Sequence, residues 1–425
     1  MKVIEGLLKD VALPRMAPVR QLFDGTEEKD VAGAVMAEIA KPGIAERIRP
    51  GMTVAVGVGS RGLAELPTLV RATVEGLRAR GAEPFIVPAM GSHGGATDEG
   101  QAALLAKLGV TAETVGCPIR SSMGTVELGR LPNGLPILMD RLAMEADGIV
   151  VINRVKPHTS FSGEIESGLA KMITIGLGKQ QGAESCHAQG FGMMAENVVE
   201  MARIKLGIAP ILFGIATVEN AYDRIRHTEA VPAEEILARE PELLRMAKAN
   251  MPRVLFNPLD VLVVDLIGKE FSGTGADPNI TGRPGTPYLK TELEVGRLVY
   301  LALSPKSGGN ATGMGLCDVT TRALFDGIDF AATYANHLTS TVLTGAKVPM
   351  MMDSDRRAVQ AAIKTCNAPD MGQLRVVRIP NTLHLGTILV SEALLDEAQA
   401  HPQIEVLGPV EEWPFDGNDR QAPFP

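Results

Sequence analysis

The sequence predicts an α/β protein made of two α/β domains, the first with a largely parallel sheet. Short apolar runs alternate with segments of helical periodicity, which is typical of strands followed by helices. The chain has 425 residues, more than one ordinary domain, and 45% of them are hydrophobic, enough for sizeable cores. Prolines punctuate the chain near residue 252, so we expect domains at residues 1–252 and 253–425.

In the first domain, strand and helix alternate from residue 53 onward. TVAVGVG at 53–59 is an apolar run, LAELPTLVRATVEGLRARG at 63–81 has helical periodicity, and PFIVPAMG at 84–91 is apolar again. Two more strands are expected at 147–155 (DGIVVINRV) and 211–219 (ILFGIATVE), and a helix is expected within 232–249. This alternation indicates a parallel sheet.

The second domain repeats the pattern. Strands are expected at 260–268, 298–304, 374–380 and 386–391, and helical segments at 320–338 and 354–367. The polar, proline-rich end 411–425 contains the only Trp. We expect it to wrap over the surface or to pack back on the first domain.

Composition excludes several classes of partner. The net charge is −9 and no Lys/Arg cluster has the density that binding to a nucleic acid backbone requires. The first 16 residues lack the apolar core of a signal peptide, and no apolar run could span a bilayer. The four cysteines are widely spaced, which indicates reduced thiols. We expect a cytoplasmic protein that binds a small molecule, with a homo-oligomer left open.

Three polar loops follow the strands of the first domain: GSRG at 59–62, GSHGGAT at 91–97 and KPHTSFSGE at 156–164. Ligands bind beyond the carboxyl ends of parallel strands, so these loops are expected to converge on one site, in the cleft between the domains. The segment 156–187 also places two of the seven histidines around Lys171 among glycines. This segment has the composition of an active-site wall.

Two histidines at neighbouring strand ends, His93 and His158, suit a reaction that needs an acid/base group on each face of a carbon. Racemisation and epimerisation are such reactions. With His187 as a third ligand, the same residues could instead form a three-histidine metal site, as in a zinc-type hydrolase. A non-catalytic cofactor-binding protein is the third alternative, and a single loop histidine is about as often structural as functional.

The lysines and arginines near these loops suggest anion binding and covalent chemistry. Lys171 lies between small residues and an apolar run, where partial desolvation would make it nucleophilic. Lys156, Lys179 and Arg61 suit phosphate or carboxylate groups. In the second domain, Asn279, Thr281 and Arg283 in the loop GKEFSGTGADPNITGR are the candidates for substrate contacts, whereas His337 and His384 are read equally well as structural.

Taken together, Arg61 in GSRG, His93 in GSHGGAT, the segment from His158 to Lys171, and His187 sixteen positions later resemble the nickel-dependent lactate racemase family. The resemblance covers the first domain and, loosely, the second. It implies a nickel pincer nucleotide, pyridinium-3,5-bisthiocarboxylate mononucleotide with Ni, that accepts hydride from a 2-hydroxy acid during racemisation or epimerisation.

The resemblance also implies roles for single residues. His93 and His158 match the acid/base pair, Lys171 matches the lysine that tethers the cofactor, and His187 matches the nickel ligand. The cofactor-binding residues are expected to be Lys171, Arg61, Ser60, Lys156, Gly163 and Gly168. The family's substrate-binding Gln and Lys have no clear match in the second domain, so lactate itself is not predicted as the substrate.

Overall fold

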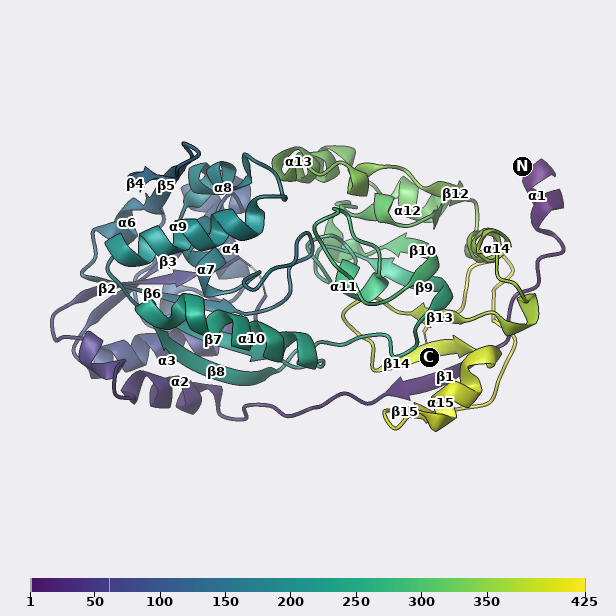
Figure 1. Cartoon of the computed structure of the whole chain (residues 1–425), viewed down its shortest axis with the longest axis horizontal. Helices are drawn as coiled ribbons and strands as arrows, with labels where there is room; N and C mark the ends of the chain where they lie inside the picture. The colour runs from purple at the N-terminus through teal and green to yellow at the C-terminus, as the bar shows by residue number, and fades with distance from the viewer. Residues whose placement is uncertain (1, 61, 425) are drawn as a thin grey trace. The chain divides into compact units, whose positions relative to one another are not determined.

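The computed structural model describes residues 2–60 and 62–424, which form two compact units (Figure 1). The N-terminal unit is Gly25–Met251, and the C-terminal unit combines Met1–Asp24 with Pro252–Pro425. The sequence placed residues 1–24 in the first domain, whereas the structure groups them with the C-terminal unit. Strand β1 (Met16–Gln21) explains this difference, because it pairs with two strands near the end of the chain.

The N-terminal unit is built on a five-stranded sheet in the order β3-β2-β6-β7-β8. Strands β2 (Thr53–Val58), β3 (Glu83–Pro88), β6 (Gly148–Arg154) and β7 (Ile211–Glu219) are parallel, and β8 (Ile225–Pro232) is antiparallel to β7. The predicted largely parallel sheet is therefore confirmed. The central strands are rich in Val, Ile and Ala because both faces of the sheet are covered.

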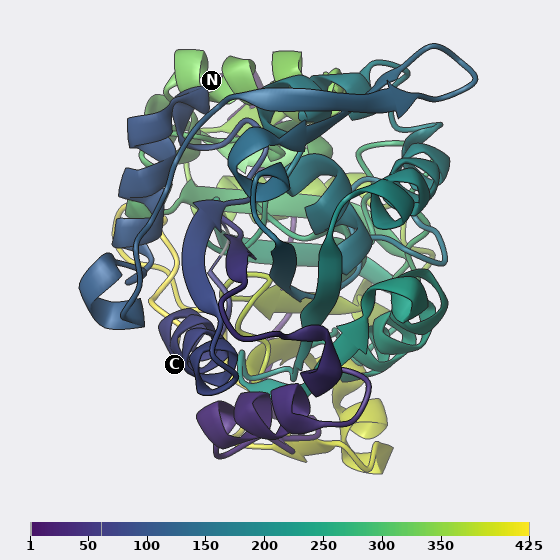
Figure 2. The same cartoon turned by 90° about the vertical axis from the view of Figure 1, so that its left-hand side faces the viewer.

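Helices cover both faces of this sheet (Figure 2). Alternate strand residues contribute to two separate cores: Val54 and Val56 to one, Ala55 and Val151 to the other. The first core includes residues of α2 (Val31–Ala40), α3 (Leu66–Ala79), α4 (Asp98–Lys107) and α5 (Ala112–Val115). The second includes residues of α6 (Arg141–Met144), α7 (Leu169–Lys171), the π-helical turn η3 (Met172–Gly176) and α10 (Ile236–Asn250).

Helices α8 (Lys179–His187) and α9 (Met194–Ile208) pack on the π-helical turn. A separate antiparallel hairpin, β4 (Thr125–Arg130) and β5 (Pro136–Asp140), contacts α8. No helix in the part of the chain that the structure describes is long and apolar enough to cross a membrane.

The C-terminal unit is also α/β, as predicted, with an eight-stranded sheet in the order β12-β11-β10-β9-β13-β14-β1-β15. Its parallel half contains β9 (Leu259–Ile267), β10 (Val295–Leu303), β11 (Val319–Thr321), β12 (Met350–Met352) and β13 (Val376–Ile379). Strands β14 (Thr387–Ser391), β1 and β15 (Ile404–Val406) add an antiparallel half.

The helices of this unit are α1 (Lys2–Leu8), α11 (Pro278–Thr281), α12 (Arg322–Asp326), α13 (Phe330–Ser340), α14 (Asp355–Thr365) and α15 (Leu395–Ala400). Short 3-10 turns in the two units are η1 (Ala45–Arg47), η2 (Gly94–Ala96), η4 (Ala233–Glu235), η5 (Pro305–Ser307), η6 (Met314–Leu316), η7 (Thr344–Ala346), η8 (Met371–Gln373) and η9 (Glu392–Leu394).

The C-terminal tail packs within the C-terminal unit, whereas the sequence predicted that it either wraps over the surface or packs back on the first domain. Trp413 is 5% exposed and joins the core formed by α14 and strands of the sheet. The buried Arg378 donates a hydrogen bond of 2.7 Å to the carbonyl of Ala422 and pairs with Asp265. The tail therefore supplies both apolar cover and a polar partner to this unit.

Candidate active site

The loops after β2, β3 and β6 all leave the same edge of the parallel sheet, as the sequence predicted. The structure brings two of them together through a hydrogen bond between Ser60 Oγ and His93 Nδ1. Arg61, the third candidate in these two loops, lies outside the described residues. The first two loops are therefore in contact at the strand ends.

The His93 loop turns sharply through glycines. Gly94 has a φ of +66°, and a Cβ there would lie 2.7 Å from the carbonyl of Gly100, so no other residue fits without a backbone shift. The backbone N–H of His93 donates to the carbonyl of Met90 at 3.1 Å, and the His93 side chain is exposed. This geometry places the imidazole at the surface of the unit.

The His158 loop holds its imidazole in one tautomer. The backbone N–H of Ser160 donates to His158 Nδ1 at 3.0 Å, which leaves the ring proton on Nε2. The ring lies 4.4 Å from that of Phe161 and 6.1 Å from that of Phe191, measured between centroids. Two aromatic neighbours and a backbone contact thus fix its position.

The buried carboxylate of Glu166 organises the backbone of the same loop. It accepts hydrogen bonds from the backbone N–H groups of His158 at 2.7 Å and Gly163 at 3.1 Å, and it pairs with Lys248 at 2.6 Å. Lys156 pairs with Ser167 through the backbone at the start of the loop. The backbone of Gly163 is therefore held by Glu166.

Lys171 ends the short helix α7, whose first turn is held by the part-buried Asn153 and the buried Glu240. Asn153 Nδ2 donates to the carbonyl of Gly168 at 2.7 Å, and the Glu240 carboxyl accepts from the N–H of Ala170 at 2.8 Å. A Cβ on Gly168 would lie 2.2 Å from Glu240 Oε1. Gly168 is buried, and its lack of a side chain makes room for this carboxyl.

Two buried charged groups near α7 have shifted pKa values. Burial raises the pKa of Glu240 to about 7, although backbone hydrogen bonds from Ala170 and Leu169 lower it. Burial lowers the pKa of Lys205 to about 7, and its Nζ donates to the carbonyls of Ile173 and Thr174 at 2.9 and 2.8 Å. These carbonyls belong to the π-helical turn that follows Lys171, and such turns are frequent at functional sites.

His187 is the last residue of α8, and its Nδ1 donates to the carbonyl of Ala183 at 2.7 Å. The pKa of His187 is lowered, and burial is the largest cause. The hydrogen bond to Ala183 raises this pKa in part, and the charge of Lys171 lowers it further. The lowered pKa favours the neutral imidazole, and because Nδ1 donates to Ala183, the lone pair of the neutral ring is on Nε2. Its ring centroid lies 5.7 Å from that of Phe191, which also contacts His158.

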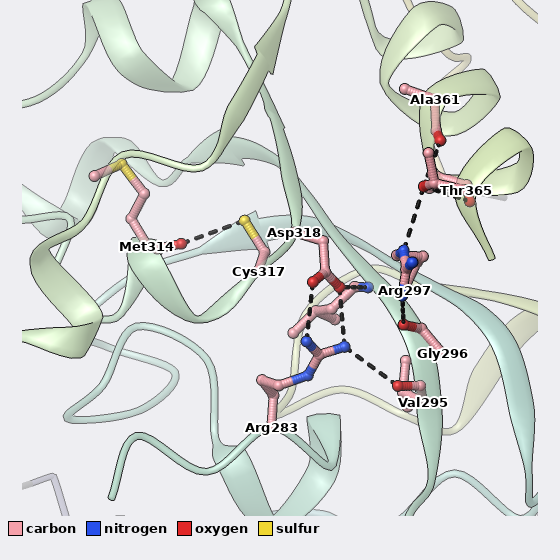
Figure 3. Close-up of polar contacts among 11 residues, drawn as sticks. Arg283, Val295, Gly296, Arg297, Met314, Cys317, Asp318, Ala361 and Thr365 are labelled. Carbon is pink, nitrogen blue, oxygen red and sulfur yellow. Dashed lines mark hydrogen bonds and ion pairs between the residues drawn. The ribbon is translucent and has the colours of Figure 1, made fainter.

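The candidates of the C-terminal unit make contacts within that unit. Arg283 forms two hydrogen bonds to Asp318, at 3.0 and 2.9 Å, and one of 3.2 Å to the carbonyl of Val295 (Figure 3). Thr281 is fully buried, and Asn279 Nδ2 donates to Asp277 at 2.9 Å. Their role in substrate binding stays a prediction.

The other two histidines of this unit differ in burial. His337 is 4% exposed and its Nδ1 donates to the carbonyl of Val342 at 2.6 Å, as expected of a structural histidine. His384 is exposed and contacts Asn381. Within residues 2–60 and 62–424, no group of three or more His, Cys, Asp or Glu side chains is arranged to hold a metal ion.

Sequence reasoning missed the buried charges that support these loops. Glu166, Glu240 and Lys205 were not singled out from the sequence, although Lys205 falls on the apolar stripe of α9 with Met201 and Ala202. The position of Lys205 on this stripe was the sequence feature that could have predicted its burial. Lys179 was expected to bind a phosphate or carboxylate ligand, but it is fully buried and pairs with Asp140 at 2.8 Å.

Fold and site together define an α/β protein with imidazoles and a lysine on the strand-end loops of a parallel sheet. Residues 11–199 match the family model described as the lactate racemase N-terminal domain, which confirms the predicted resemblance over this segment. All the candidates of the N-terminal unit lie within it.

One solved structure with a similar fold is the lactate racemase apoprotein from Thermoanaerobacterium thermosaccharolyticum. The two chains are 15% identical, and the alignment covers 83% of this chain and 87% of that one with a TM-score of 0.50. At this identity the likeness shows the fold. No curated protein matches the chain.

Proposed function

We propose that this chain is a racemase or epimerase of a 2-hydroxy acid and works with a nickel pincer nucleotide. The match of residues 11–199 to the lactate racemase N-terminal domain supports this proposal. The observation in the structure that carries it is the 2.7 Å hydrogen bond from His187 Nδ1 to the carbonyl of Ala183, which directs the other ring nitrogen, Nε2, to a metal. The reaction class is proposed from the names of the matched domain and the comparison protein, and the cofactor is proposed from residues of this chain.

The residues present fit such a cofactor. A histidine that ligates a metal usually donates its other ring N–H to a carbonyl or carboxylate, as His187 does to Ala183. We assign Nε2 of His187 as the nickel ligand and the half-buried amine of Lys171 as the tether. Ser60 and Lys156, on loops at the same sheet edge, are assigned to the cofactor's polar groups. Arg61 is assigned to the same groups from the resemblance of its motif alone.

When bound, the cofactor supplies a hydride acceptor for the α-hydrogen of the substrate. The histidines then manage the hydroxyl proton. His93 accepts it from one enantiomer and His158 from the other, because two imidazoles on different loops can serve two orientations of the hydroxyl. Each histidine returns a proton to the keto oxygen in the reverse direction.

The tautomer of His158 bears on this assignment. With Ser160 N–H on its Nδ1, the neutral ring offers an N–H donor from Nε2 toward a substrate oxygen. His158 can accept the hydroxyl proton only after the Ser160 contact opens, because either Nδ1 takes that proton or the ring proton first moves from Nε2 to Nδ1. The hydroxyl of Ser60 on His93 Nδ1 can donate or accept, so it does not impose one tautomer on His93.

Metal and cofactor analysis of the protein co-expressed with the cofactor's biosynthetic enzymes tests the proposal. We expect bound nickel and a cofactor absorption band, and interconversion of at least one enantiopure 2-hydroxy acid with retention of its α-deuterium. Protein without nickel and without the band would refute the proposal. Exchange of the α-deuterium with solvent would exclude hydride transfer.

Variants separate the roles. His187→Ala is expected to lose nickel, whereas His93→Gln and His158→Gln are expected to keep it and lose interconversion. His401→Gln, in the C-terminal unit, is the matched control and is expected to behave like the wild type. If His93→Gln and His158→Gln both kept full activity, the acid/base assignment would be wrong.

A further inference from the structure

A buried polar network lies beneath the His93 loop. Lys179 is fully buried, and its Nζ is 2.8 Å from Asp140 Oδ2, 2.6 Å from the carbonyl of Pro88 and 3.4 Å from Gln101 Oε1. Asp140 and Gln101 are also fully buried. Pro88 is the last residue of β3, so the network begins where the His93 loop begins.

Gln101 connects this charge pair to the loop. Its Nε2 donates to the carbonyls of Gly91 at 2.9 Å and His93 at 3.2 Å, while its Oε1 faces Lys179. Gln101 comes from α4, the helix that follows the loop. The amide nitrogen of one buried side chain thus donates both to the carbonyl of His93 and to that of Gly91, two residues before it.

Lys179 also connects the loop to the helix that ends at His187. It is the first residue of α8, with a φ of +55°, a conformation that is uncommon for a residue with a side chain. Such a conformation persists only where the surroundings determine it. The backbone N–H of Gly91 donates to the carbonyl of Gly176, the last residue of the π-helical turn η3, at 3.1 Å. This second contact joins the His93 loop to the segment directly before α8.

We propose that Gln101 and Lys179 are positioning residues for the reaction: their hydrogen bonds fix the backbone of His93 and tie it to helix α8. The role of His93 in this inference rests on the function proposed above. Neither residue touches the reacting atoms. Their effect is to hold the acid/base ring at a defined place relative to the helix that carries His187.

Gln101→Met removes both donors to the loop, retains a side chain of similar length and leaves the pair of Lys179 with Asp140 intact. Gln101→Glu keeps an acceptor for Lys179 but also removes the donors. The matched control is Gln21→Met, because Gln21 is equally buried and donates to two backbone carbonyls in the C-terminal unit. Lys179→Met combined with Asp140→Asn removes the pair without leaving a buried charge.

The first readout does not depend on the cofactor. Hydrogen exchange of the amides of residues 89–97, in the protein as purified, is expected to accelerate about tenfold in Gln101→Met and Gln101→Glu. The titration of the His93 ring, assigned by NMR through its loss in His93→Gln, is expected to shift in both variants. Gln21→Met is expected to change neither measurement.

In cofactor-loaded enzyme, both Gln101 variants are expected to lower kcat about 10- to 100-fold with a smaller change in KM. Exchange and His93 titration identical to those of the Gln21→Met control would overturn the positioning role. A loosened loop in a chain that interconverts no 2-hydroxy acid would instead overturn the proposed function and leave the positioning role standing.

Discussion

Glu240 offers the sharpest test of how the Lys171 segment is held. Its carboxyl is 1% exposed, accepts from the N–H of Ala170 and has a pKa raised by burial to about 7. In the unfolded chain the carboxyl ionises near the ordinary value of 4.5. The folded state therefore binds one more proton than the unfolded state between pH 4.5 and 7.

The sign and size of the effect follow from linkage. The contribution of Glu240 to the free energy of unfolding is fully present below pH 4.5 and is lost as the pH rises to about 7. A shift of one pKa unit corresponds to 1.36 kcal/mol, so the loss is about 3 kcal/mol. Glu240→Gln keeps an acceptor for Ala170 and cannot ionise, so this pH dependence should disappear.

Urea unfolding followed by far-UV circular dichroism at pH 5, 6, 7 and 8 measures the difference. Relative to the wild type, Glu240→Gln is expected to gain about 3 kcal/mol of unfolding free energy between pH 5 and 8. Glu242→Gln is the matched control, because it lies on the same helix and is exposed. Parallel pH profiles for Glu240→Gln and the wild type would show that this carboxyl does not titrate in the window.

Three further predictions concern the same buried groups and the C-terminal candidates. Gly168→Ala should lower the free energy of unfolding by about 1–3 kcal/mol, because its Cβ would displace the Glu240 carboxyl; a urea titration checks this. The folded pKa of Lys205 is lowered to about 7, so above pH 7 the unfolded chain binds more protons at this lysine than the folded protein does. The wild type should therefore gain stability relative to Lys205→Met as the pH rises from 7 to 9, and the Tm of both proteins across that range checks the sign. Arg283→Ala should lower the free energy of unfolding by about 1–2 kcal/mol, because it removes the pair with Asp318. Unfolding monitored by the fluorescence of the single tryptophan checks this. A raised KM with an unchanged free energy of unfolding would instead support a substrate contact.

Local patterns were sufficient to predict the centre of each sheet. The apolar runs at β2, β3, β6 and β7 were recognised because a strand covered on both faces consists almost entirely of apolar residues. The positions of the three loops followed from the strands. That the three loops leave the same edge of the sheet follows from its parallel topology.

Partners far apart in the chain could not be predicted in the same way. Met16 pairs with Ser391 in the sheet of the C-terminal unit, and no pattern in the first 24 residues indicates this partner. Strand β8 was also missed, because its sequence IRHTEAVP mixes polar and apolar residues at the edge of a sheet. Edge strands depend on what covers them, which is a property of the tertiary structure.

In the candidate site, the sequence predicted the reactive side chains but not the groups that hold the loop backbone. Loops at strand ends contain N–H and C=O groups that no strand or helix satisfies, and each buried group of this kind needs a partner. Here charged or amide side chains supply those partners: Glu166 for the His158 loop, Gln101 for the His93 loop, and Glu240 and Lys205 for the segment around Lys171. A residue type alone cannot reveal this role, since the same Glu or Lys on a helix usually faces water.

These supporting groups also explain how the unit can hold the imidazoles of His93 and His158 on irregular loops. A buried side chain that is bonded to the loop backbone restricts the loop without occupying the surface on which the ring is displayed. Mutations beneath the loops are therefore expected to change the position and titration of the histidines before they change the fold. The sequence identifies which side chains can react, and the buried polar contacts determine where those side chains are held.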